Sequence, residues 1–160
     1  MSRISLRSAA VGTVAALAVL AGSVGIYRTF LDGGTQQAQL SEAKMVEGRA
    51  LYMEHCASCH GADLEGQENW RERRADGRLP APPHDASGHT WHHPDSQLFA
   101  VTKHGTAAFA PEGYKTDMRG FAGEMSDADI RLVLDWIKAQ WPDDIRERQA
   151  EITRRAGGEG

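Results

Sequence analysis

The clearest periodic pattern lies near the end of the chain. Between residues 130 and 140, apolar side chains recur every three or four positions and the positions between them are mostly polar. These apolar residues are Ile130, Val133, Leu134 and Ile137, with Trp136 at the edge of the stripe. Because this spacing places them along one helix face, the sequence predicts an amphipathic helix over residues 130–140.

Two weaker helical signals flank this helix. Pro94 suits the first turn of a helix and Gly105 its end, and the residues between them supply apolar cover. The tail over residues 142–160 has acidic residues near its start and places Glu151 four positions before Arg155, which favours a short helix. Because few of its side chains are apolar, we expect this tail to be a docked or fraying appendage.

The start of the chain has a different character. An uncharged, weakly apolar run extends from Ala9 to Tyr27, with two arginines before it and one after it. As a helix this run would be about 28 Å long, close to the thickness of the hydrocarbon core of a bilayer. The sequence therefore predicts a membrane anchor within residues 1–31, followed by a short tether over residues 32–41.

The alternative for this segment is a cleaved export signal. Ala21-Gly22-Ser23 provides small residues suited to cleavage. Because the arginines before the run favour a cytoplasmic N-terminus, both interpretations place the rest of the chain at the outer, periplasmic face of the cytoplasmic membrane. There it would be anchored through residues 9–27, or soluble after cleavage.

Composition limits the architecture and the partners. The chain has 160 residues and a formal net charge of -4, and its basic start leaves the remainder more acidic than the whole. This length allows one modest domain plus a leader. Because an acidic body does not attract phosphate backbones, we expect no nucleic acid partner.

Both cysteines of the chain stand in one motif, Cys56-Ala57-Ser58-Cys59-His60. This is the attachment pattern of c-type haem, in which the two thiols bond the vinyl groups and the adjacent histidine binds iron. Other interpretations fit less well. A thioredoxin-like pair needs a surrounding βαβ pattern, a zinc site needs a second pair of ligands, and a disulfide over so short a loop would add little stability.

From about residue 41 to residue 141, the chain resembles the class I c-type cytochromes. In that family, the helix before the first cysteine carries a small residue and an aromatic residue at four-residue intervals, as Gly48, Tyr52 and Cys56 do here. The resemblance implies an all-α fold with about three main helices around one covalent haem c. In such a fold the first helix crosses the last one.

The resemblance also implies a methionine as the second axial iron ligand, shortly before the last helix. Met118 stands in this place, although Arg119 and Gly120 depart from the residues that usually follow the methionine. Met125 and a distal histidine are the alternative ligands. Met125 has another use, because it can pack against Ile130 across a helix N-cap at Ser126.

Residues before and between His60 and Met118 are further candidates for the haem pocket. In the resembled family a proline carbonyl accepts the hydrogen bond from Nδ1 of the iron-binding histidine, which orients the imidazole. Any of three prolines could supply this carbonyl, and Tyr52 and Trp91 could line the pocket. The three candidates are Pro80, Pro82 and Pro83.

A histidine-rich segment follows the prolines. His89, His92 and His93 invite a copper or zinc hypothesis, since imidazole is a favoured ligand of both metals. The interpretation we favour is that Trp91 and some of these histidines line the haem edge and bind its propionates.

Taken with the resemblance, these features predict a cytochrome c domain over residues 42–141. Its expected activity is the transfer of single electrons between redox proteins, without enzymatic chemistry of its own, because His60 and Met118 fill both axial positions of the iron. One alternative is a haem subunit of a membrane oxidase or dehydrogenase. The other is a histidine-rich copper-binding or sensing protein.

Overall fold

The computed structural model describes residues 41–157. The anchor or signal segment predicted over residues 1–31 lies outside this range, and so does the predicted tether except for its last residue. Between residues 41 and 157, no helix combines the length and the apolar character that crossing a membrane requires.

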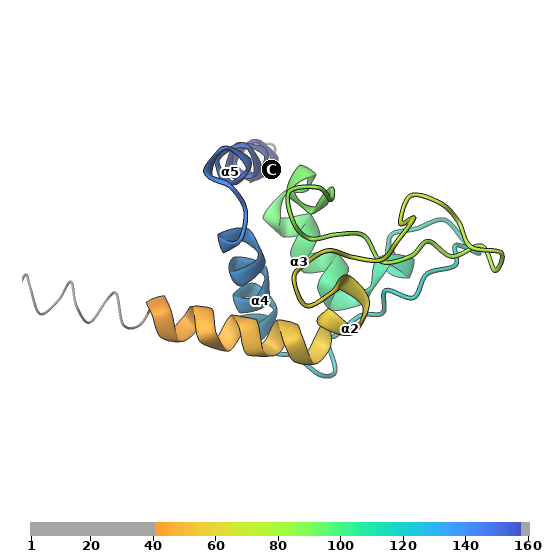
Figure 1. The fold of residues 1–160 in the computed structure, drawn as a ribbon, viewed down its shortest axis with the longest axis horizontal. Coiled ribbons are helices and arrows are strands. Elements are labelled where there is room, and N and C mark those ends of the chain that lie inside the picture. Colours follow the sequence, from red (N-terminus) through yellow and green to blue (C-terminus); the bar gives the residue numbers. More distant parts are fainter. Residues whose placement is uncertain (1–40, 158–160) are drawn as a thin grey trace, which may run out of the picture. The chain divides into compact units, whose positions relative to one another are not determined.

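The described part of the chain is mostly helical, as predicted (Figure 1). A first helix covers residues 41–55, and it is followed by α2 (Ala57–His60), η1 (Thr90–His92), α3 (Asp95–His104), η2 (Thr106–Ala108), α4 (Asp127–Ala139) and α5 (Asp143–Gly157). The sequence predicted about three main helices. The two other α-helices in residues 41–157 are the single turn α2 and the tail helix α5.

The helix over residues 41–55 crosses α4 (Figure 1), and a glycine lies at the contact. A Cβ atom at Gly48 would lie 2.7 Å from the Leu132 carbonyl oxygen and 2.8 Å from Cβ of Trp136, so only a hydrogen fits there. One turn later the buried Tyr52 ring lies 4.8 Å, between centroids, from the Trp136 ring. The small residue and the aromatic therefore produce the predicted crossing.

The core is assembled around this crossing from residues distant in sequence. Its buried apolar side chains are Tyr52, Leu64, Phe121, Met125, Ile130, Val133, Trp136, Ile137 and Trp141. Ile130, Val133 and Ile137 of the predicted stripe are buried, and Leu134 is partly buried. Trp136 lies deeper than its place at the edge of the stripe suggested, since it is 8% exposed.

Ser126 is the N-cap of α4, as the sequence predicted, and Asp129 completes a capping box. The Ser126 hydroxyl accepts a hydrogen bond from the Asp129 amide at 3.2 Å, and the Asp129 carboxylate accepts one from the Ser126 amide at 2.9 Å. Met125 before the cap and Ile130 after it are both buried, as a hydrophobic staple requires. The helix begins three residues before the predicted start, because its first turn is polar and lies outside the apolar stripe.

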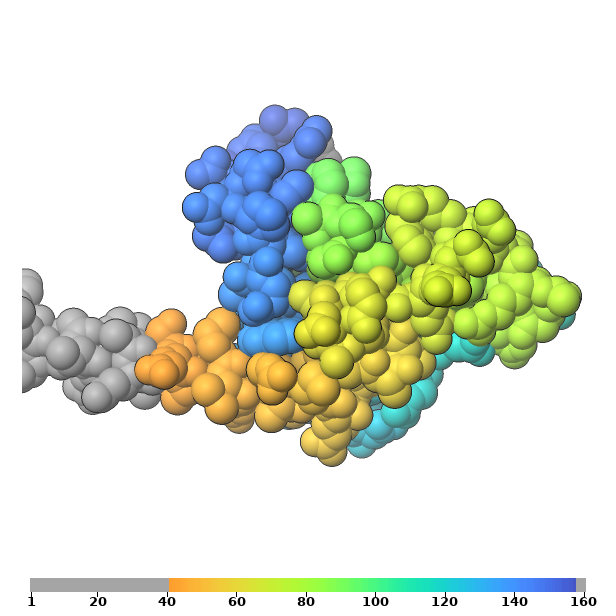
Figure 2. All heavy atoms as spheres, in the orientation of Figure 1, coloured from red at the N-terminus to blue at the C-terminus, as the bar shows by residue number. Residues whose placement is uncertain are grey.

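Two long segments without helices connect some of these elements. Residues 61–89 connect α2 to η1, and residues 109–126 connect η2 to α4. Figure 2 shows the atoms of the first segment, in yellow and yellow-green, over a large part of the visible face. These segments contain the three prolines and Met118, so the candidate site depends on how tertiary contacts hold the loops.

The tail helix α5 is docked, which is one of the two alternatives that the sequence left open. Gln149 is 4% exposed, and its amide nitrogen donates to the His93 carbonyl oxygen at 3.2 Å and to the Asp95 carboxylate at 2.8 Å. The Thr153 hydroxyl accepts a hydrogen bond from the Asp95 amide at 3.1 Å, one of the amides that a helix start leaves unpaired. Polar side chains make this contact, which explains why a search for apolar positions missed it.

Candidate functional site

The two thiols lie on the turn that continues the first helix. Cys56 precedes α2 and Cys59 lies within it, and the amides of Cys59 and His60 both donate to the Cys56 carbonyl oxygen, at 3.1 and 3.0 Å. Both thiols are free, with Cys56 half-buried and Cys59 exposed. Burial raises the pKa of the Cys56 thiol to about 11, with a further contribution from Cys59. The geometry therefore presents two thiols one helical turn apart, followed at once by an imidazole.

His60 is buried and oriented by a single hydrogen bond. Its Nδ1 lies 2.8 Å from the Pro82 carbonyl oxygen, and because a carbonyl can only accept, Nδ1 carries the proton. Burial lowers the pKa of the imidazole, while the bond to Pro82 opposes that shift. A neutral imidazole with its proton on Nδ1 has the lone pair of Nε2 available for a metal.

Among the three candidate prolines, the structure brings Pro82 to His60. The Pro83 carbonyl instead faces Gly88, where an added Cβ atom would collide with it at 2.0 Å. Pro80 is buried two residues earlier. The choice between these carbonyls depends on the path of the loop, which the sequence alone did not determine.

Tyr52 supports the turn after His60. Its hydroxyl donates to the Gly61 carbonyl oxygen at 2.8 Å, and Gly61 itself has a positive φ of 82°, a backbone conformation that glycine adopts at little cost. Burial raises the pKa of Tyr52, which keeps the hydroxyl protonated as a donor. This residue links the helix crossing directly to the end of the Cys-x-x-Cys-His motif.

The structure also places His84 against His60, which the sequence did not suggest. The two rings are stacked, with centroids 3.9 Å apart and planes inclined by 24°. Nδ1 of His84 lies 2.8 Å from the Thr90 hydroxyl. Burial lowers the pKa of His84 well below its usual range, and the imidazoles of His60 and His89 add to this effect. The only sequence signal for this contact was the position of His84 two residues after Pro82, the residue that binds His60.

Met118 lies on a loop that passes closely over the end of α3. Its carbonyl oxygen accepts from the Thr106 amide at 3.2 Å, and its side chain is partly buried against the core. A Cβ atom at Gly120 would lie 2.6 Å from the His104 carbonyl carbon, and one at Gly105 would lie 2.7 Å from the Gly120 amide. The departure from the family pattern at Gly120 thus coincides with a place where the backbones need a glycine.

Ion pairs tie this loop to the long segment after α2. The Asp117 carboxylate lies 2.9 Å from Nε of Arg78 and 3.6 Å from Nη1 of Arg74. These side chains are 38 to 56% exposed, so each pair contributes little by itself. Together they connect two loops at the residue next to Met118.

Met125, the alternative ligand, is placed differently. It is 5% exposed within the core, and its amide donates to the Phe121 carbonyl oxygen at 2.9 Å. Its side chain belongs to the staple at the start of α4, as described above. The geometry therefore favours Met118 over Met125 as a ligand, because Met118 keeps part of its surface uncovered.

The histidine-rich segment is arranged around tryptophans. Trp91 and His92 are stacked at 3.6 Å between centroids, and Trp70 is stacked on His89 at 5.5 Å. His93 contacts His89 edge to face at 5.4 Å. No group of three His, Cys, Asp or Glu residues between residues 41 and 157 is placed to hold a metal ion. The indole of Trp91 donates to the Ala86 carbonyl oxygen at 3.3 Å.

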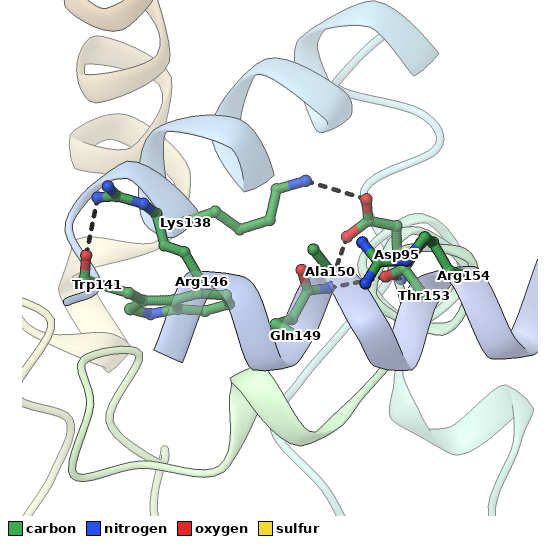
Figure 3. Close-up of a pocket in the computed structure, with 8 residues that line it drawn as sticks. All are labelled: Asp95, Lys138, Trp141, Arg146, Gln149, Ala150, Thr153 and Arg154. Atoms are coloured by element: carbon green, nitrogen blue, oxygen red, sulfur yellow. Dashed lines mark hydrogen bonds and ion pairs between the residues drawn. The ribbon is translucent and has the colours of Figure 1, made fainter. Parts of the chain in front are cut away.

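A groove of about 400 Å³ lies elsewhere, between α5, the end of α4 and the start of α3 (Figure 3). It is lined by Asp95, Lys138, Trp141, Arg146, Gln149, Ala150, Thr153 and Arg154. Its charges are paired with neighbours, as Lys138 is with Asp95 at 3.1 Å. None of these residues belongs to the predicted site.

The residues around His60 fit a covalently attached haem. Two unbridged thiols share one turn, and the adjacent imidazole presents Nε2 while Pro82 holds Nδ1. Cys56, Trp91 and Met118 pack against the core but stay partly uncovered, as expected of side chains that contact a bound group. The donor set of thiols, imidazole and thioether is that of c-type haem.

Known proteins are similar to this chain over most of its length. A family model described as cytochrome c matches residues 45–141. The Cbb3-type cytochrome c oxidase subunit FixP of Azorhizobium caulinodans is 26% identical over 135 residues, which cover 83% of this chain and 42% of FixP. The chain thus spans less than half the length of that relative. No solved structure matches the chain.

Proposed function

Since the chain belongs to the cytochrome c family, we propose that it binds one haem c and transfers single electrons between redox proteins. The observation that carries this proposal is the turn that presents Cys56, Cys59 and a buried His60 whose Nδ1 is held 2.8 Å from the Pro82 carbonyl oxygen. The thiols would attach the haem, and the carbonyl would fix the imidazole that binds it.

Each residue has a defined task in this proposal. Cys56 and Cys59 would form the thioether bonds, and His60 and Met118 would bind the iron. A haem held by these two side chains would supply one-electron redox chemistry at a comparatively high reduction potential. The protein contributes the orientation of the two ligands and a pocket that excludes water. With both axial positions filled, no position is open for a substrate, so we propose no catalytic residue.

We also propose that the protein works at the outer face of the cytoplasmic membrane, held there through residues 9–27 or released by cleavage. FixP is named as a subunit of a cytochrome c oxidase, which supports an exported site of action. The donor and acceptor would be redox proteins with exposed cofactors.

The similarity to FixP supports a second candidate function, a haem subunit of an oxidase complex. It extends over 83% of this chain, and thus beyond the attachment motif. Purification of the protein from its native membrane distinguishes the two candidate functions. Stoichiometric recovery with oxidase subunits would favour the subunit, and recovery of the chain alone would favour the mobile carrier.

Visible absorption of the purified protein tests the proposed function. We expect a sharp α band of the reduced protein and a weak red band of the ferric protein from methionine ligation. The haem should stay with the polypeptide after denaturation and extraction, because its attachment is covalent. Met118→Ala should lose the red band, whereas the matched variant Met125→Ala should keep it and lose about 2–5 kcal/mol of stability from its core position. Absence of covalent haem in the wild-type protein would refute the proposal.

A further inference from the structure

The proposed function gives His84 no part in haem attachment or axial ligation, yet its ring is stacked on that of His60, the proposed proximal ligand. Its ring centroid lies 3.9 Å from that of His60, with the planes inclined by 24°. Aromatic pairs in general have centroids about 4.5 to 7 Å apart. Only nearly parallel rings approach more closely, since a ring turned edge-on would overlap its neighbour.

His84 is itself held at three atoms, one on its ring and two on its backbone. Its Nδ1 lies 2.8 Å from the Thr90 hydroxyl, and Thr90 is 7% exposed. Its backbone amide donates to the Leu64 carbonyl oxygen at 2.8 Å. Its carbonyl oxygen accepts from the indole of Trp141 at 2.7 Å. Leu64 and Trp141 both belong to the buried core, so the ring stands on a rigid support.

The bond from His60 to Pro82 leaves one motion of the imidazole weakly restrained. A single hydrogen bond at Nδ1 fixes the position of that one atom. The imidazole ring can still tilt about the axis of this hydrogen bond. A flat ring at 3.9 Å opposes this tilt, because rotation would drive the imidazole edge into the His84 ring. The carbonyl and the stack therefore restrain different motions of the same side chain.

From this geometry we infer that His84 is a positioning residue, whose ring sets the plane of the His60 imidazole relative to the haem. This inference rests on the proposed function, since it requires His60 to be an axial ligand. The plane of an axial imidazole selects the iron orbital that holds the unpaired electron of the ferric state. Groups that orient a ligand in this way tune the metal without touching it.

Proton NMR of the ferric holoprotein tests the inference, because the hyperfine shifts of the four haem methyl groups report the imidazole plane. Two variants separate ring shape from volume: His84→Phe keeps a flat ring, and His84→Leu fills the space without one. We expect His84→Phe to keep the wild-type order and spread of the methyl shifts and His84→Leu to change both. An unchanged pattern in His84→Leu would overturn the inference, as would an equal change in both variants.

A third variant keeps the test decisive if His84→Leu does not take up haem. Thr90→Val removes the hydroxyl that lies at Nδ1 of His84 but does not change the His84 side chain itself. We expect its methyl pattern to move away from that of the wild type, because the supporting ring gains freedom, and a pattern identical to the wild type would overturn the inference. Loss of covalent haem from the wild-type protein would instead refute the proposed function, so the two failures are distinguishable.

Discussion

Gly48 shows how a single residue sets the distance between two helices. Its backbone lies against α4 so closely that a Cβ atom would stand 2.7 Å from the Leu132 carbonyl oxygen. The spacing of Gly48 and Tyr52 before Cys56 could be predicted from the sequence, because it repeats along one helix. The crossing itself was expected from the resemblance, whereas the contact with the Leu132 carbonyl was found only in the structure.

Replacing Gly48 with alanine should therefore destabilise the protein. Alanine favours helix over glycine by about 1 kcal/mol, but overpacking a close contact costs about 1–3 kcal/mol. We expect a net loss of about 1 kcal/mol in the free energy of unfolding, measured by urea denaturation of the holoprotein. Gly123→Ala is the matched control, since an added Cβ atom at Gly123 meets nothing within 4 Å. A Gly48→Ala protein as stable as the wild type would contradict the close packing.

At the scale of elements, the loops are held by polar contacts that pattern analysis does not detect. Asp117 joins the Met118 loop to Arg74 and Arg78 of the long segment after α2. The capping box of α4 was predictable, since its residues are three positions apart. The arginine pairs were not, because about 40 residues separate their partners.

Replacing Asp117 with alanine should loosen the Met118 loop. Exposed ion pairs contribute about 0.2–1 kcal/mol each, so loss of both would favour displacement of Met118 by about fivefold. Titration of the ferric protein with imidazole, which would compete with the proposed ligand Met118 for iron, measures this change as tighter imidazole binding. Glu151→Ala is the control, because Glu151 pairs with Arg154 and Arg155 on α5. Equal effects of the two substitutions would refute a specific role for Asp117.

For the whole molecule, the bound haem matters to folding as well as to function. Between residues 41 and 157 the core consists of few apolar side chains, and long segments without helices surround it. Cys56, Trp91 and Met118 at its border are only partly covered. The haem would cover these surfaces and anchor the loops that carry Pro82 and Met118.

A chain unable to attach haem should therefore be largely unfolded or molten. For Cys56→Ala/Cys59→Ala, we expect weak near-ultraviolet circular dichroism and a broad thermal transition, because the remaining apolar contacts do not offset the entropy of the loops. The wild-type holoprotein, measured under the same conditions, should unfold in one sharp transition. A cooperative transition of similar enthalpy in the double variant would show that the core folds without the cofactor.

The sequence by itself determined the attachment motif, the capping box and the apolar stripe of α4, because each depends on residues within one or a few helical turns. The tertiary structure decided which of three proline carbonyls reaches His60, that the His84 ring stacks on it, and that the polar helix α5 docks on the start of α3. These outcomes depend on the path of long loops and on hydrogen bonds between distant residues, and no local spacing encodes either.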